Sequence, residues 1–230
     1  MNRNDFIIEG TTLVKYIGED DNVDVSDGVT KIGKLAFDER IKTIKLPDSL
    51  TEIDEAAFEG CLNLKSLYIP DSVKVIGKYA FHWCESLEDI RLPEGIKVIP
   101  DGAFDMCSSL KSVSIPKSVV EIGNEAFSAC RQLENVSIPN EVKTIGTECF
   151  WGCLSLRSMY FPEGVERLGD RMFYHCINLK NLYIPGSVGY IGDEIVQFCP
   201  KDKVIHCKEN SYAHKYAVKY RLNYAFDNNV

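Results

Sequence analysis

Cysteine and histidine are the residues of this chain with the most specific chemistry, and its 230 residues include nine cysteines and four histidines. A row of thiols could bind metal ions or form disulfide bonds. Seven of the cysteines recur at intervals of 23 residues: Cys61, Cys84, Cys107, Cys130, Cys153, Cys176 and Cys199. This regular spacing indicates that they occupy one position of a repeated unit.

Equivalent side chains of stacked units point in the same direction and not at one another, which disfavours disulfide bonds along this series. No Cys-x-x-Cys pair occurs, and Cys149, four residues before Cys153, takes a position that is alanine in other units. We therefore predict free, reduced and buried thiols that pack as small hydrophobic side chains.

The histidines do not complete a metal site either. His82 and His175 lie four units apart, which is about 19 Å at the spacing of neighbouring strands and too far to share an ion. His206, Cys207 and His214 could meet near the C-terminus, but the sequence indicates no fourth ligand. We expect no metal and no other cofactor.

Motifs of the common enzyme classes are missing from the chain. It has no Gly-x-Ser-x-Gly, no glycine-rich phosphate loop and no His-Glu-x-x-His. We therefore predict that the protein is not an enzyme. A hydrolase is the remote alternative, which a deep pocket with perturbed carboxylates would support.

The cysteines belong to a repeated unit of 23 residues. Prolines and phenylalanines recur with the same spacing, which shows that the whole unit is repeated and not the cysteine alone. The prolines are Pro47, Pro70, Pro93, Pro116, Pro139, Pro162 and Pro185, and the phenylalanines are Phe58, Phe81, Phe104, Phe127, Phe150 and Phe173. In compact form the unit reads L-x-x-(I/L/V)-x-(I/L)-P-x-x-(V/I)-x-x-I-G-x-x-A-F-x-x-C-x-x.

This unit resembles the BspA-like leucine-rich repeats, a bacterial and protozoan subclass with a 23-residue period. The likeness covers residues 6–226 and is carried by three steps: Ile69-Pro70, then Val73, Ile76 and Gly77, then Ala80, Phe81 and Cys84. The resemblance implies the fold and says less about function. Proteins with such repeats are often surface or secreted proteins of host-associated microbes, and adhesion is the implied role.

One unit predicts a strand, a turn and a returning segment. Residues 67–69 alternate and suit a strand with one buried face, and Pro70 ends it because proline lacks a backbone donor. Gly77 is expected to permit a positive φ, and Ala80-Phe81 to lie on a short helical turn. The predicted fold is an α/β repeat solenoid: a right-handed leucine-rich repeat superhelix with short parallel strands on its concave face.

Both ends of the chain depart from the repeat, as terminal units should. We predict a single domain over residues 1–230, with an N-terminal β-hairpin cap (1–22), about eight repeats (23–207) and a helical C-terminal cap (208–230). Residues 6–18 read as two strands around Gly10-Thr11, and the unit containing Phe37 is two residues short. The cap helix is expected from Ser211, its N-cap, to about Arg221.

Two rows of side chains should point outward from the predicted strands. The flanking row is small and polar and is expected to form hydrogen bonds along the sheet: Thr43, Ser66, Asp89, Ser112, Asn135, Ser158 and Asn181. The central row varies more: Lys45, Tyr68, Arg91, Ser114, Ser137, Tyr160 and Tyr183. Exposed tyrosine and arginine are enriched in binding hot spots, although tyrosine also favours strands. We predict Lys45, Tyr68, Arg91, Tyr160 and Tyr183 as the partner-binding residues.

A second set of bulky side chains lies just before the cysteine position. Equivalent units have glycine, methionine or alanine there, so the repeat does not require bulk. We expect Trp83 and Trp151 to cover the adjacent loop, because tryptophan is highly buried on average. Partner contact is the alternative for both residues.

Charge and hydropathy restrict the partners. Twenty-six basic residues against 34 acidic ones give a net charge of −8, which disfavours nucleic acid as a partner. No run of about 18 apolar residues predicts a transmembrane segment, and the first ten residues show no signal peptide. The missing signal and the reduced thiols favour the cytoplasm, whereas the resemblance favours the cell surface or secretion if a leader has been removed.

The function predicted from these observations is a non-enzymatic recognition module, adhesin-like in its use. It would bind a protein or glycan partner through the concave face and act as a monomer. The alternative is a structural spacer, or a fragment of a larger surface assembly, without a ligand of its own.

Overall fold

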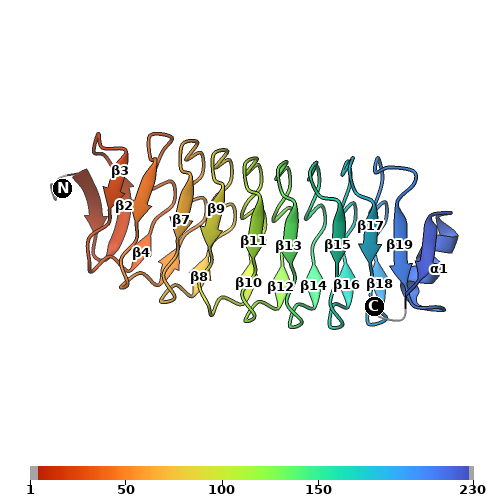
Figure 1. Ribbon diagram of the computed structural model, residues 1–230. Coiled ribbons are helices and arrows are strands. Elements are labelled where there is room, and N and C mark those ends of the chain that lie inside the picture. Colours follow the sequence, from red (N-terminus) through yellow and green to blue (C-terminus); the bar gives the residue numbers. More distant parts are fainter. Residues whose placement is uncertain (1–4, 228–230) are drawn as a thin grey trace.

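A computed structural model describes residues 5–227, and the parts of the predicted caps at residues 1–4 and 228–230 lie outside it. The chain winds into about nine stacked turns, as the 23-residue repeat predicts. Figure 1 shows the turns side by side in one row, with a hairpin at the N-terminal end and a helix at the C-terminal end. The parallel-strand repeat solenoid is therefore confirmed.

Each turn has one longer strand at the position predicted from the Leu-x-x-Leu-x-Leu pattern. These strands are β3 (Asn22–Asp24), β5 (Thr43–Lys45), β7 (Ser66–Tyr68), β9 (Asp89–Arg91), β11 (Ser112–Ser114), β13 (Asn135–Ser137), β15 (Ser158–Tyr160), β17 (Asn181–Tyr183) and β19 (Val204–Cys207). Paired neighbours run parallel in register, so that equivalent residues face each other. Hydrogen-bonded pairing is interrupted at intervals and links β3–β5, β7–β9, β11–β13 and β15–β17–β19.

A second strand in each turn was not foreseen. It spans only two residues: β4 (Lys31–Ile32), β6 (Glu52–Ile53), β8 (Val75–Ile76), β10 (Val98–Ile99), β12 (Glu121–Ile122), β14 (Thr144–Ile145), β16 (Arg167–Leu168) and β18 (Tyr190–Ile191). These strands form their own row beneath the longer ones in Figure 1. The returning segment is therefore a second parallel sheet, and the solenoid has two sheets.

The second sheet breaks between β8 and β10 for a reason that is visible in the sequence. At each other step, the residue after the short strand donates its N–H to the preceding turn, as Gly77 N does to Ile53 O at 2.8 Å and Gly123 N to Ile99 O at 2.8 Å. Pro100 takes this position between β8 and β10, and proline has no N–H to donate. The missing donor divides the row into two five-stranded sheets: β4, β6 and β8 together with the N-terminal strands β1 (Phe6–Glu9) and β2 (Thr12–Tyr16), and β10 to β18.

The glycine of the repeat has a different role from the predicted one. Gly77 does not have a positive φ. A Cβ on Gly77 would instead lie 2.3 Å from the backbone nitrogen of Glu55 in the preceding turn. Glycine is needed because two backbones approach each other closely there.

Left-handed backbone occurs at two other positions of the turn, mostly at residues that are not glycine. Tyr79 has φ of 56° and Trp83 has φ of 62°. Equivalent positions carry Gly102 and Gly60, also with positive φ. Because left-handed residues interrupt a helix, the segment containing Ala80-Phe81 forms hydrogen-bonded turns and not the predicted helical turn.

Phenylalanine rings fill the space between the two sheets. Phe37, Phe58, Phe81, Phe104, Phe127, Phe150 and Phe173 are all buried and form a continuous stack, with centroids of successive rings 5.0–5.7 Å apart. Each ring from Phe58 to Phe150 contacts the ring of the turn before and the ring of the turn after. The stability of a turn therefore depends on its neighbours, as in other repeat proteins.

The cysteine series lies beside this stack, and its thiols are free, as predicted. From Cys84 onward, each thiol of the series also makes a contact that the sequence did not reveal. Cys84 Sγ donates to Phe58 O at 3.2 Å and Cys107 Sγ to Phe81 O at 3.1 Å, and the same bond recurs up to Cys199. Burial raises the pKa of these thiols, to about 11 at the partly exposed Cys199. The thiols thus link neighbouring turns as weak hydrogen-bond donors.

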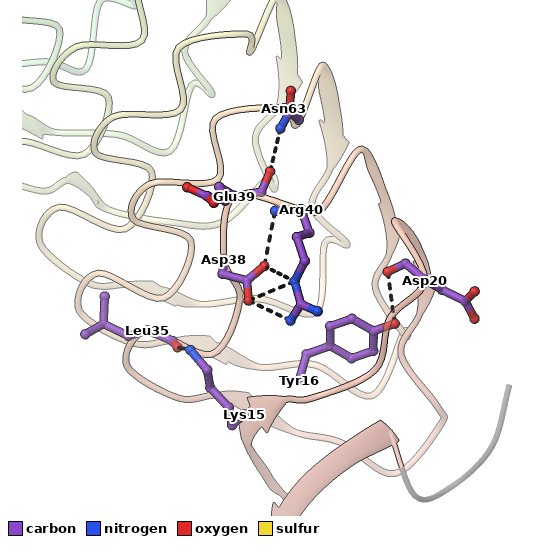
Figure 2. Close-up of polar contacts among 8 residues, drawn as sticks. All are labelled: Lys15, Tyr16, Asp20, Leu35, Asp38, Glu39, Arg40 and Asn63. Atoms are coloured by element: carbon purple, nitrogen blue, oxygen red, sulfur yellow. Dashed lines mark hydrogen bonds and ion pairs between the residues drawn. The ribbon is translucent and has the colours of Figure 1, made fainter.

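The N-terminal end is closed by the predicted antiparallel hairpin, β1 (Phe6–Glu9) and β2 (Thr12–Tyr16). Figure 2 shows how it contacts the next turn: Lys15 Nζ donates to Leu35 O at 2.7 Å, and Tyr16 Oη donates to Asp20 O at 3.0 Å. The ring of Tyr16 lies 6.3 Å from that of Phe37 and so begins the aromatic stack.

The turn that is two residues short has its own set of contacts. Arg40 binds both carboxylate oxygens of Asp38, with Nη2–Oδ2 at 2.8 Å, and this contact lowers the pKa of the Asp38 carboxyl. Asn63 Nδ2 of the next turn donates to Glu39 O at 2.7 Å (Figure 2). Arg40 itself occupies the position that is cysteine in the following turns.

The C-terminal end is closed by a helix and a strand. Helix α1 (Tyr212–Lys219) begins at the predicted N-cap, where Ser211 Oγ accepts the N–H of His214. It is shorter than predicted, and the final segment is a strand, β20 (Asn223–Phe226), parallel to β19. No helix in residues 5–227 is long and apolar enough to span a membrane.

Candidate recognition face

The solvent side of the longer strands, here called the long-strand face, brings the predicted site residues into one row. The third residues of the longer strands are aligned where the strands pair in parallel: Asp24, Lys45, Tyr68, Arg91, Ser114, Ser137, Tyr160, Tyr183 and His206. Two members were missed. Asp24 precedes the first regular unit, and His206 follows the last one, where the repeat pattern is lost.

Tyr160, Tyr183 and His206 form an aromatic stack at the C-terminal end of the row. The ring centroids of Tyr160 and Tyr183 are 4.0 Å apart at an angle of 8°, and those of Tyr183 and His206 are 4.2 Å apart at 13°. His206 Nε2 is held 3.0 Å from Asn181 Oδ1. Contact with the Tyr160 hydroxyl, followed by burial, raises the pKa of Tyr183. Tyr160, at 58% exposure, is the most accessible of the three.

Tyr68 and Arg91 form a second, charged cluster nearer the N-terminus. The Arg91 guanidinium lies 4.8 Å from the ring centroid of Tyr68. It also binds the carboxylate of Asp71 with two hydrogen bonds, of 2.9 and 2.8 Å, and this lowers the pKa of Asp71. The arginine is thereby held in a fixed orientation.

The structure does not bring all five predicted residues together. Lys45 lies one strand before Tyr68, with Nζ 3.9 Å from Asp24. Arg91 and Tyr160 are three strands apart, which is about 14 Å at the spacing of parallel neighbours. Between them the row holds only Ser114 and Ser137. The face therefore has two separate clusters on either side of a low, serine-lined region.

The flanking row does not form the predicted ladder of hydrogen bonds. Thr43 Oγ1 donates to Asn22 Oδ1 at 2.7 Å at the N-terminal end of the row. From β7 to β15, within the described chain, no side-chain hydrogen bond joins neighbours of this row. These small polar groups remain available to a partner.

Trp83 and Trp151 are more exposed than the average burial of tryptophan predicts. Their exposed fractions are 47% and 37%, and Trp83 Nε1 donates to Glu85 at 3.0 Å. Both lie at the edge formed by the phenylalanine turns and not on the long-strand face.

The histidines considered as metal ligands do not come together in one site. His206 belongs to the aromatic stack, whereas His214 packs against Tyr224 and Phe226. Within residues 5–227 no three metal-ligating side chains come together. Burial raises the pKa of Asp105, which lies 3.1 Å from His82 Nδ1, but neither residue lines the main hollows of the surface.

A hollow of about 410 Å³ lies on the long-strand face between β13 and β15. Its lining comprises Glu134, Asn135, Val136, Ser155, Arg157, Ser158, Tyr160 and Asn178. A second hollow, of about 260 Å³, lies over the short strands β12 to β16 and is lined by Gly123, Gly146 and Gly169 among others. Its glycines are explained by close backbone contact between turns.

Comparison with known sequences and structures places this architecture among bacterial repeat proteins. The BspA-type leucine-rich repeat region matches in six copies over residues 16–134 and 97–225. A search of curated proteins found no match. The fold and repeat are those of scaffolds that are generally not enzymes.

Three solved structures illustrate the likeness. A leucine-rich repeat protein of T. pallidum is 28% identical, with a TM-score of 0.67 over 99% of this chain and 97% of that one. One from Bacteroides ovatus is 27% identical, with a TM-score of 0.66 over 81% of this chain. The pneumococcal vaccine antigen PcpA shares the fold at 19% identity, with a TM-score of 0.53 over 92% of this chain and 69% of that one. The present chain spans 55% of the Bacteroides ovatus protein.

Proposed function

Because the chain belongs to the BspA-type leucine-rich repeat family, we propose that it is a non-enzymatic recognition module, adhesin-like in its use. Its long-strand face binds a protein or glycan partner. Tyr160 and Tyr183 anchor one end of the contact, Tyr68 and Arg91 anchor the other, and Lys45 assists.

One observation carries this proposal. At equivalent positions of the central row the fold accepts serine, as at Ser114 and Ser137, yet tyrosine and arginine occupy the positions on either side. The stacking of one turn on the next therefore does not require large exposed aromatic or guanidinium groups at these positions. Such groups are the ones that contribute most to binding energy at interfaces.

The preformed geometry of both clusters supports the same function. Arg91 is fixed by Asp71 and Tyr68, and Tyr183 is fixed between two rings. Side chains that are already ordered lose less conformational entropy when a partner binds. The face is therefore pre-organised for recognition.

The test uses arrays of purified extracellular proteins and of glycans, probed with the intact chain and with the double variant Tyr160→Ala/Tyr183→Ala. We expect binding to at least one array member, lost in the double variant while the melting temperature stays nearly unchanged. Tyr212→Ala is a matched control, because Tyr212 is an exposed tyrosine (41%) of the cap helix, away from the face. Binding that is equal in the double variant and the wild type would disprove the assignment to this face, and no binding at all would favour a structural spacer.

A further inference from the structure

We propose that the gap between β13 and β15 is a subsite for one neutral pyranose residue of a glycan. The inference rests on the proposed function and specifies the class of ligand for one part of the long-strand face. It is carried by an opening in the sheet, an uncovered aromatic ring and a set of unused polar groups.

The opening is one of three breaks in the pairing of the longer strands, and it differs from the breaks at β5–β7 and β9–β11 in the residue exposed beneath it. β13 and β15 are not hydrogen-bonded to each other, although β11–β13 and β15–β17 are. The middle residue of each longer strand points to the core and is buried in the described turns from Val23 to Ile205, apart from Val136. Val136 is partly exposed and lines the hollow. The gap therefore reaches an apolar floor that the other turns keep covered.

The aromatic wall of the hollow is one face of Tyr160. Tyr183 covers the opposite face at a centroid distance of 4.0 Å and a nearly parallel angle of 8°. On the β13 side the equivalent central residue is Ser137, which is too small to cover a ring. The free face of Tyr160 is thus presented to the hollow and held in place from behind, as a stacking platform requires.

The rim of the hollow offers hydrogen-bonding groups that the protein does not use. Within residues 5–227 the side chains of Asn135, Ser155, Arg157 and Ser158 make no hydrogen bond or ion pair with the chain. Asn178 donates through Nδ2 to Leu154 O at 2.8 Å, which leaves its carbonyl oxygen free. Amide and hydroxyl groups both donate and accept, which matches the hydroxyl groups of a sugar.

Size and charge favour a neutral sugar over other ligands. The volume of about 410 Å³ falls at the small end of the range of ligand sites. One acidic and one basic side chain, Glu134 and Arg157, leave the lining without net charge. A pyranose combines a flat face of C–H groups, suited to Tyr160 and Val136, with a polar edge suited to the rim. Tyr183, which is stacked between Tyr160 and His206, has both faces covered and cannot serve in this way.

The experiment is saturation-transfer NMR of the intact chain with the methyl glycosides of glucose, galactose, mannose, N-acetylglucosamine and N-acetylgalactosamine, followed by titration of each binder. We expect saturation transfer to at least one glycoside, strongest at its C–H protons. Tyr160→Ala and Asn135→Ala should each raise the Kd about tenfold or more, whereas Tyr160→Phe, which keeps the ring, should change it much less.

Tyr212→Ala is again the control and should bind as the wild type does, and the melting temperature of each variant reports correct folding. No transfer to any of the five glycosides, or equal transfer in the folded Tyr160→Ala variant, would overturn the inference. Failure of the subsite is distinguishable from failure of the proposed function. A protein from the array that binds the wild type but not Tyr160→Ala/Tyr183→Ala, without any glycoside binding, would retain the recognition face and remove only the sugar site.

Discussion

The interior of the solenoid and its long-strand face differ in how strictly the residue type is repeated. In the interior, the phenylalanine and the cysteine of one turn pack on those of the turn before. On the long-strand face, equivalent positions of one row hold lysine, tyrosine, arginine or serine. The same turns build both regions. Phe81 and Phe104 are fully buried and 5.3 Å apart, while Tyr68 and Tyr160 are more than half exposed. The difference shows which positions the stacking of turns requires and which it leaves free.

The left-handed positions equivalent to Tyr79, here called the corners of the turns, are intermediate between the interior and the long-strand face. Their backbone is fixed in a left-handed conformation, but their side chains range from Gly102 to Tyr79 and Glu194. Here the fold specifies a dihedral angle and not a side chain. Three substitutions test this distinction between required and free positions, and they are given in order of decreasing effect on the free energy of unfolding.

The largest effect is expected in the interior. Phe104→Ala should lower the free energy of unfolding by about 3–5 kcal/mol, because it removes a buried ring that contacts Phe81 and Phe127 and leaves a cavity. Urea denaturation followed by circular dichroism measures the loss. Tyr160→Ala on the face should cost less than about 1 kcal/mol. Equal losses in the two variants would contradict the distinction between interior and face.

A smaller effect is expected for the thiols. Cys107→Ala should cost about 1–2 kcal/mol, because it removes a buried sulfur and the Sγ donor 3.1 Å from the Phe81 carbonyl, which then keeps only the N–H of Cys84 at 3.2 Å. Cys149→Ala is the matched control, since Ala103 and Ala126 occupy the equivalent position of other turns. The same denaturation experiment compares the two, and a loss for Cys149→Ala as large as for Cys107→Ala would show that volume matters and the hydrogen bond does not.

The smallest effect is expected at the corner, and with the opposite sign. Glu194 is exposed and has φ of 57°, so Glu194→Gly should raise the free energy of unfolding by about 1 kcal/mol by relieving left-handed strain. Glu194→Ala keeps the Cβ and should give no gain. If both variants behave alike in thermal denaturation, the backbone at this corner is not strained.

Much of the fold could be predicted from residue spacing. The register of the phenylalanines and cysteines and the strand before each proline are confirmed, and the ends of the stack hold an antiparallel hairpin and a helix capped by Ser211. The short strands were missed because two residues cannot show an alternating pattern. The role of Gly77 was misassigned because a positive φ and a close approach between turns both require glycine.

The candidate site could be predicted only in part. The row from Lys45 to Tyr183 followed from strand alternation, and its role in binding stays a prediction. His206 was missed because its unit no longer follows the repeat, although His206 lies two residues after Val204, as Tyr183 lies two after Asn181. Alignment of the last strand with its predecessor by that spacing could have found it.

The sequence by itself determined the period, the buried core positions and the row of side chains that face solvent, because these depend on spacing within one unit. Only the tertiary structure decided that Tyr160 stacks on Tyr183, that Arg91 is held by Asp71, and that the sheet opens beside Val136. Those features depend on distances between turns. Such distances are set by how neighbouring side chains and backbones pack, and no single unit contains that information.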